Sequence, residues 1–131
     1  VADVSSGFRR LHALNACTND FDRVRWILNV PNTSNTLGPP SVSRGIFYVG
    51  TDQGHLVALA DPSVAPASGT ICSNPDVSVA ACPGAGFKVI PVPAVLRNVT
   101  LDSGQILTEP ALARGRVYVA STSGTLYLLE P

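Results

Sequence analysis

Short runs of alternating apolar and polar residues recur along the chain, separated by turn residues. Residues 46–49 (Ile-Phe-Tyr-Val) follow residues 41–43 (Ser-Val-Ser) after the dipeptide Arg44-Gly45. Alternation of this kind is typical of half-buried strands, and glycine supplies the positive φ that a two-residue hairpin turn needs. A second turn at 51–54 leads into the apolar run 56–59. The pattern therefore predicts a meander of three antiparallel strands.

The same pattern returns 70 residues further on. Residues 38–61 and 107–130 align without gaps, so that Arg44-Gly45 stands opposite Arg114-Gly115. Because repetition at a fixed offset indicates repeated structural units, we expect the two segments to have the same shape. A third copy begins before the first residue of the chain: residues 11–15 match residues 56–60, a separation of 45 residues.

A fourth strand completes each unit in this interpretation. It is predicted at 24–27 after the first copy and at 87–90 after the second. Tandem four-stranded meanders are the building block of a β-propeller. The sequence thus predicts an all-β chain, a partial ring of about two to three blades in one domain, 1–131. The expected parts are an incomplete first blade (1–30), a second blade (31–95) with an inserted loop (62–86), and an incomplete third blade (96–131).

Composition and charge argue against several classes of protein for this chain. Hydrophobic residues make up 45% and charged residues 14% of the chain, which argues against a disordered tail. The net charge is zero and charges are scattered, so no footprint for nucleic acid is expected. No apolar run has membrane-spanning length. The chain opens Val-Ala-Asp-Val and contains no methionine, so we expect a processed product or an excerpt of a longer polypeptide.

The repeated string resembles the pyrroloquinoline-quinone (PQQ) repeat of quinoprotein-type β-propellers. Residues 44–61 and 114–130 carry it, and residues 5–26 carry it more weakly. The resemblance implies that Trp26 packs between blades. In the second unit the corresponding position falls near Ile90 and the tryptophan is absent, so weaker or different docking is expected there.

Enzymes with these repeats hold PQQ and a calcium or lanthanide ion, with a catalytic aspartate and often a vicinal disulfide. The chain has no adjacent cysteines, no haem-attachment motif and no Asp, Glu or Asn group with metal-ligand spacing. We therefore assign no catalytic, cofactor-binding or metal-binding residue. PQQ and calcium are expected as cofactors only if the parent protein is a dehydrogenase.

Cysteines and sequons are the remaining candidate modification sites. Cys72 and Cys82 bracket a Ser/Asn/Pro/Gly-rich stretch and are candidates for a disulfide. A disulfide is consistent with export from the cytosol, which the resemblance implies. The alternative is two free thiols. Cys17 is left over, either buried and unpaired or bridged to sequence outside the chain. Asn32 and Asn98 begin sequons expected in connections between strands.

Single polar residues point to structure rather than chemistry. His12 and His55 are expected to be surface or hydrogen-bonded residues. Asp52 and Asp61 are expected to make side-chain-to-backbone turn bonds.

Three functional hypotheses follow. The first is a non-enzymatic propeller segment of an exported protein, extracellular, periplasmic or at the cell envelope. It would act as a scaffold or protein-binding module, with loops 62–86 and 91–106 supplying contacts. The alternative is a fragment of a PQQ-dependent alcohol or sugar dehydrogenase whose catalytic residues lie outside this chain. In a third hypothesis several copies of the chain assemble into one ring.

Overall fold

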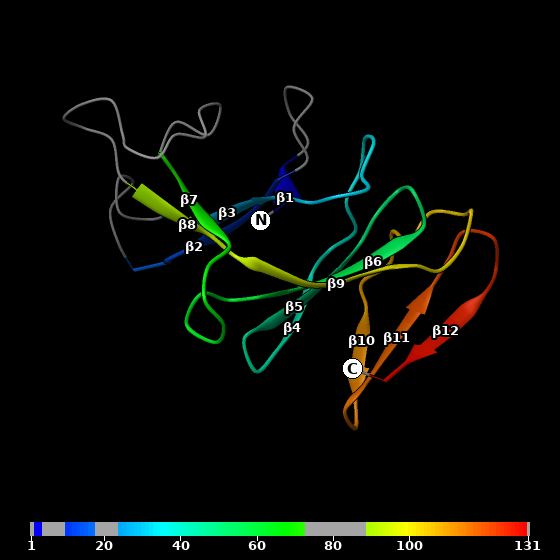
Figure 1. The fold of residues 1–131 in the computed structure, drawn as a ribbon. Helices are drawn as coiled ribbons and strands as arrows, with labels where there is room; N and C mark the ends of the chain where they lie inside the picture. The colour runs from blue at the N-terminus through cyan, green and yellow to red at the C-terminus, as the bar shows by residue number, and fades with distance from the viewer. Residues whose placement is uncertain (1, 4–9, 18–23, 73–88, 131) are drawn as a thin grey trace.

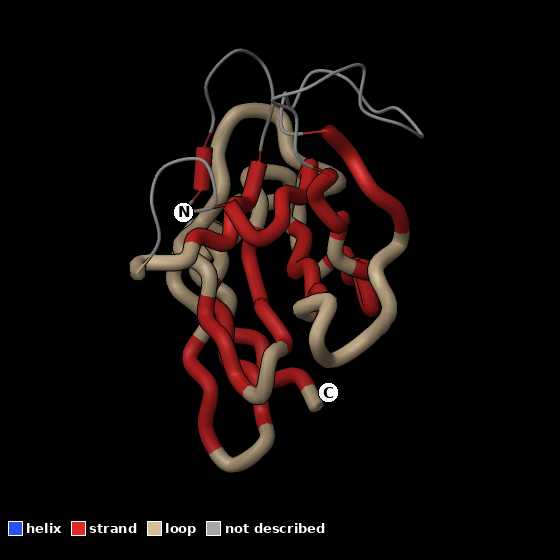
Figure 2. The backbone as a smooth tube through the Cα atoms, turned by 90° about the vertical axis from the view of Figure 1, so that its left-hand side faces the viewer, coloured by secondary structure: helices blue, strands red, loops and turns tan. Residues whose placement is uncertain are grey.

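The computed structural model of the chain describes residues 2–3, 10–17, 24–72 and 89–130. All regular structure in these ranges is β, as the alternating pattern predicted (Figures 1 and 2). No helix of the described part is long and apolar enough to cross a membrane.

Antiparallel sheets follow one another along the chain (Figure 1). The first sheet contains β1 (Ala2–Asp3), β2 (Arg10–Leu14) and β3 (Val24–Asn29). The second contains β4 (Ser41–Ser43), β5 (Ile46–Gly50), β6 (His55–Ala60) and β9 (Ala94–Thr100). The third contains β10 (Ala111–Ala113), β11 (Arg116–Ala120) and β12 (Leu126–Leu129). A hairpin of β7 (Gly69–Cys72) and β8 (Val89–Val92) is inserted between β6 and β9.

The two predicted hairpins have the same geometry. Ser41 pairs with Tyr48 in the second sheet, and Ala111 pairs with Tyr118 in the third. Both central turn residues have positive φ in each copy: 51° and 76° at Arg44-Gly45, and 50° and 74° at Arg114-Gly115. Such turns match the right-handed twist of the flanking strands. The prediction that the two repeats share one shape is confirmed.

The fourth strand of the second sheet is not where the sequence placed it. Residues 89 and 90 belong to β8, which pairs with β7, whereas β9 pairs with β6. The inserted segment forms a hairpin of its own, so the chain returns to the sheet only after Pro93. The second sheet therefore extends past the expected boundary at 95. The described part of loop 62–86 includes β7, and the segment 91–106 contains β9 rather than being a projecting loop. In the first sheet β3 confirms the strand predicted at 24–27.

The second sheet is covered on both faces, because its strands alternate between two hydrophobic cores. Phe47, Val49, Val57 and Leu59 pack with Leu11 and Trp26 of the first sheet. Tyr48, Leu56 and Ala58 pack with Val117 and Val119 of the third sheet. The middle sheet thus has a separate apolar interface with each neighbour.

The third sheet has one apolar face uncovered in the described structure. Its inward residues, Val117 and Val119, are 2% and 1% exposed. On the opposite face Leu126 and Leu128 are 70% and 52% exposed. The described sheets do not close into a ring (Figure 1).

Candidate functional site

Trp26 joins the first sheet to the second. It lies on β3 and is 1% exposed. Its ring contacts Phe47 of β5 edge-to-face, with centroids 5.1 Å apart, and its Nε1 donates a 2.9 Å hydrogen bond to Oδ2 of Asp61. Aromatic packing and a satisfied indole N–H are what a buried tryptophan requires. The side chain therefore lies between two sheets; its role in docking propeller blades stays a prediction.

The residue equivalent to Trp26 in the second sheet is Arg97, not Ile90. Trp26 pairs with Ala13, and the register shifts immediately after Ala13. Arg97 pairs with Ala58, and the register shifts immediately after Ala58. Since residues 11–15 align with residues 56–60, the two bulges are equivalent. Ile90 instead packs in the first core from β8.

Two of the three cysteines, Cys17 and Cys72, lie among the described residues. Cys72 ends β7 and is 1% exposed. Its predicted partner, Cys82, lies outside the described residues, so the disulfide stays a prediction. Cys17 is an exposed free thiol at the end of the first described loop, not the buried residue that was one of the two expectations.

The two sequon asparagines contact one another. Asn32 lies in the connection between β3 and β4 with φ 53°, as expected of a turn asparagine. Asn98 lies within β9, not in a connection, so this part of the prediction is wrong. Nδ2 of Asn98 donates a hydrogen bond to Oδ1 of Asn32, and Oδ1 of Asn98 contacts Nδ1 of His55. A glycan on Asn98 would be attached to the same Nδ2 atom that donates the first of these bonds.

Two aspartates fix the connections around the second sheet. Oδ1 of Asp61 accepts the local bond expected from the backbone N–H of Ser63 (2.9 Å). Partial burial alone would raise the pKa of Asp61. Hydrogen bonds from Ser63 and Trp26 outweigh this effect, so the net pKa is lowered.

Asp52 reaches further along the chain. Its carboxylate accepts backbone N–H bonds from Ser34, Asn35 and Thr36, and these outweigh a burial effect of opposite sign to lower its pKa. This carboxylate ties the connection that precedes β4 to the β5–β6 turn.

Asp102 is the centre of a hydroxyl cluster that sequence reasoning missed. Oδ2 accepts hydrogen bonds from Ser123, Ser121 (2.7 Å) and Tyr127 (2.9 Å), while Oδ1 accepts one from the backbone of Gly104 (2.8 Å). These bonds, that of Ser123 foremost, hold the pKa of Asp102 far below its ordinary value. The alternation of hydroxyl residues at 121, 123 and 125 was the available signal, because it places them on one side of the second turn.

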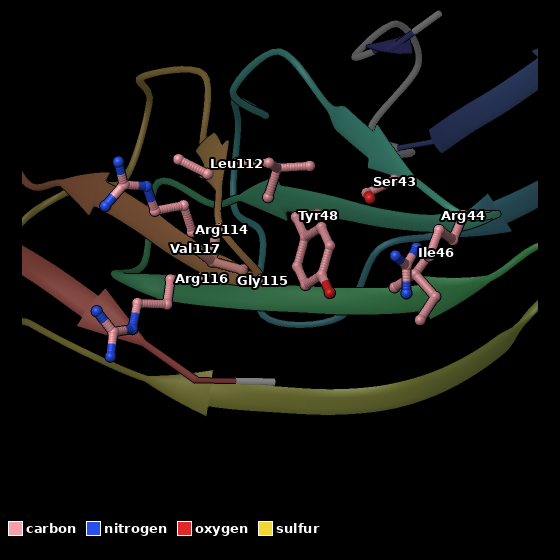
Figure 3. Close-up of a pocket in the computed structure, with 10 residues that line it drawn as sticks. Ser43, Arg44, Ile46, Tyr48, Leu112, Arg114, Gly115, Arg116 and Val117 are labelled. Atoms are coloured by element: carbon pink, nitrogen blue, oxygen red, sulfur yellow. The ribbon is translucent and has the colours of Figure 1, made fainter.

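A cleft lies between the second and third sheets, at their hairpin turns (Figure 3). Its volume is about 340 Å³. Ile46, Tyr48 and Val117 line its apolar part. Figure 3 shows the Tyr48 ring with Arg114 and Arg116 on one side and Arg44 on the other; all three arginines line the cleft. The sequence had marked Arg44 and Arg114 only as turn residues.

A second cavity of about 330 Å³ adjoins the cleft. The two cavities share Ile46, Tyr48 and Val117. The other lining residues come from β6, β9, β12 and the residue after it: Leu56, Ala58, Leu96, Arg97, Val99, Leu129 and Glu130. We call the cavity at the hairpins the cleft and the second one the Arg97 cavity.

The lining of both cavities favours the binding of an anion. Their polar groups are mainly guanidinium groups, which donate hydrogen bonds and attract anions. Arg116 is paired with Glu130 at 3.2 Å on the exposed surface. Across the described ranges no three His, Cys, Asp or Glu side chains are grouped so that they could hold a metal ion.

Searches against protein-family models, curated proteins and solved structures find no match to this chain.

Proposed function

We propose that this chain is a segment of a PQQ-like β-propeller of an exported protein, in which it serves as a non-enzymatic scaffold or protein-binding module. Three features support the proposal: the repeated meanders, their stacking in chain order, and the tryptophan between the first two sheets. The remaining blades, or a protein that presents an equivalent sheet, are the partners.

One observation carries the proposal. Tyr48, Leu56 and Ala58 of the second sheet are buried against the third sheet. Their counterparts 70 residues later are Tyr118, Leu126 and Leu128, and both leucines are exposed. The uncovered face is therefore the repeat equivalent of a face that is already an interface. Apolar patches of this kind mark sites of association.

A photo-crosslinking amino acid at position 128 tests the proposal in the native host. Position 53 is the matched control, because Gln53 is exposed but lies in a turn away from that face. We expect cross-links from position 128 to an apolar sheet, of further blades or of another protein, and few from position 53. Equal cross-linking at the two positions, or none at 128, would contradict the proposal.

The dehydrogenase alternative has its own readout. When PQQ, calcium and a dye acceptor are added to the intact parent protein with alcohols or sugars, the scaffold proposal expects no oxidation. Dye reduction that depends on PQQ would instead establish the alternative.

A further inference from the structure

We propose that the Arg97 cavity binds a small aromatic carboxylate, with its ring between the second and third sheets and its carboxylate at Arg97. This inference depends on the two sheets and their register, and it stands whether or not the chain belongs to a propeller.

The molecule contains two equivalent interfaces between neighbouring sheets. At the first, Trp26 extends from the outermost strand of its sheet and packs on Phe47 of the next. The equivalent pair at the second interface is Arg97 and Val117, from the register of β9 and the offset of 70 residues. An indole and a phenyl ring are thus replaced by a guanidinium and an isopropyl group.

The replacement leaves space. Trp26 is 1% exposed, whereas Arg97 is an exposed residue. Its side chain stands at the wall of a cavity of about 330 Å³, whereas the indole of Trp26 is buried at the first interface. Protein interiors are normally packed without such gaps, and cavities that hold small ligands begin at roughly 300 Å³. The space suits one small molecule with a ring system.

The lining selects a flat apolar ring. Leu56, Ala58, Val99 and Leu129 supply aliphatic walls. Tyr48 supplies an aromatic ring, on the opposite face of β5 from the Phe47 that holds Trp26. Edge-to-face or offset contacts with Tyr48 would stabilise an aromatic ligand beyond simple burial.

The charge selects an anion. Arg97 can form two parallel hydrogen bonds with a carboxylate. Glu130, the acidic residue of this cavity, is bonded to Arg116. Arg44 and Arg114 line the adjoining cleft and add positive charge. A carboxylate is therefore favoured over an ammonium group at the same position.

Three probes that share one ring test the inference: indole-3-acetate, the neutral indole-3-ethanol and the cationic tryptamine, each titrated into the whole chain and followed by NMR. We expect indole-3-acetate to bind about tenfold more tightly than indole-3-ethanol, since one charge-assisted interaction is lost, and tryptamine to bind most weakly. Shifts should centre on Tyr48, Ala58 and Val117. Equal affinities, absent binding or shifts elsewhere would overturn the proposal.

Variants of Arg97 separate the contribution of its charge to ligand binding from the contribution of the cavity's shape. Arg97→Gln should weaken indole-3-acetate about tenfold and leave indole-3-ethanol unchanged. Arg97→Trp should fill the cavity and abolish binding of all three probes. Arg25→Gln, on the exposed side of β3, is the matched control and should change nothing. If Arg97→Trp does not fold, Arg97→Gln alone decides: unchanged affinity for indole-3-acetate overturns the proposal.

Discussion

Trp26 of β3 and Asp61, which directly follows β6, are joined by a 2.9 Å hydrogen bond between Nε1 and Oδ2, although they lie 35 residues apart. The bond anchors the indole on one edge while Phe47 holds its ring. Asp61 is suited to this role because its other carboxylate oxygen is fixed by Ser63. One side chain therefore fixes the position of the first sheet on the second.

Shortening Trp26 should loosen that interface in two steps. Trp26→Phe retains a ring but loses the hydrogen bond, and we expect the free energy of unfolding to fall by about 1–2 kcal/mol. Trp26→Ala also removes the buried ring and should cost about 3–5 kcal/mol. Urea unfolding followed by circular dichroism measures both. Asp61→Ala combined with Trp26→Phe should be less destabilising than the sum of the single changes; strict additivity would show that the bond contributes nothing.

Gly54 and Gly124 occupy the same turn position in the two repeats but should respond differently to substitution. Both have positive φ, 75° and 91°, so alanine is strained at either, by about 1–2 kcal/mol. A Cβ at Gly54 would also lie 1.9 Å from the carbonyl oxygen of Asp102, whereas one at Gly124 meets nothing within 4 Å. We expect Gly54→Ala to lower the unfolding midpoint clearly more than Gly124→Ala. Equal losses would mean that the connection before β10 does not press on this turn.

The hydroxyl cluster at Asp102 predicts sensitivity to acid. Its pKa in the folded protein is lowered, so the stability that it contributes is present above its unfolded value of about 4 and is lost as the pH falls below that value. Asp102→Asn should flatten this loss when unfolding is measured between about pH 5 and pH 2.

A matched variant tests whether this sensitivity belongs to Asp102. Glu109→Gln removes the same charge from an exposed carboxylate that accepts a long, 3.4 Å hydrogen bond from Ser41. Its acid profile should resemble that of the unaltered chain. If Asp102→Asn also retains the full acid response, the response comes from other carboxylates; among the described residues, Asp52 and Asp61 also have lowered pKa values.

The predicted Cys72–Cys82 bridge can be tested by alkylation without reduction. Cys17 is exposed and should take up one alkyl group, while the two bridged cysteines should take up none. Reduction should then expose them and lower the stability by about 2–3 kcal/mol, as expected for a short loop. Labelling of all three cysteines before reduction would show that the bridge is absent.

The sequence predicted the parts of the fold that are controlled by local turn chemistry. Arg44-Gly45 and Arg114-Gly115 force tight hairpins, and strict alternation on either side fixes which side chains face a core. For these segments the repeat alignment was sufficient to predict strand order, pairing and relative geometry.

The fourth strand of the second sheet could not be predicted in the same way. Residues 87–90 and 94–100 both mix apolar and polar residues as a strand does, and the insertion before them removes the constant spacing that marks a repeat. Only the register of β9 on β6 shows that Arg97 takes the place of a tryptophan. The Arg97 cavity was equally hidden, because its lining residues come from five strands and the residue after β12.

The uncovered leucines of β12 also determine how a purified sample behaves. Among the described strands β12 lies at the edge of its sheet, and an edge strand beside an apolar face favours pairing with another molecule. We expect the turbidity of the solution to rise with protein concentration. We also expect the chains to associate into filaments rather than discrete particles. The double substitution Leu126→Ser and Leu128→Ser should keep such solutions clear.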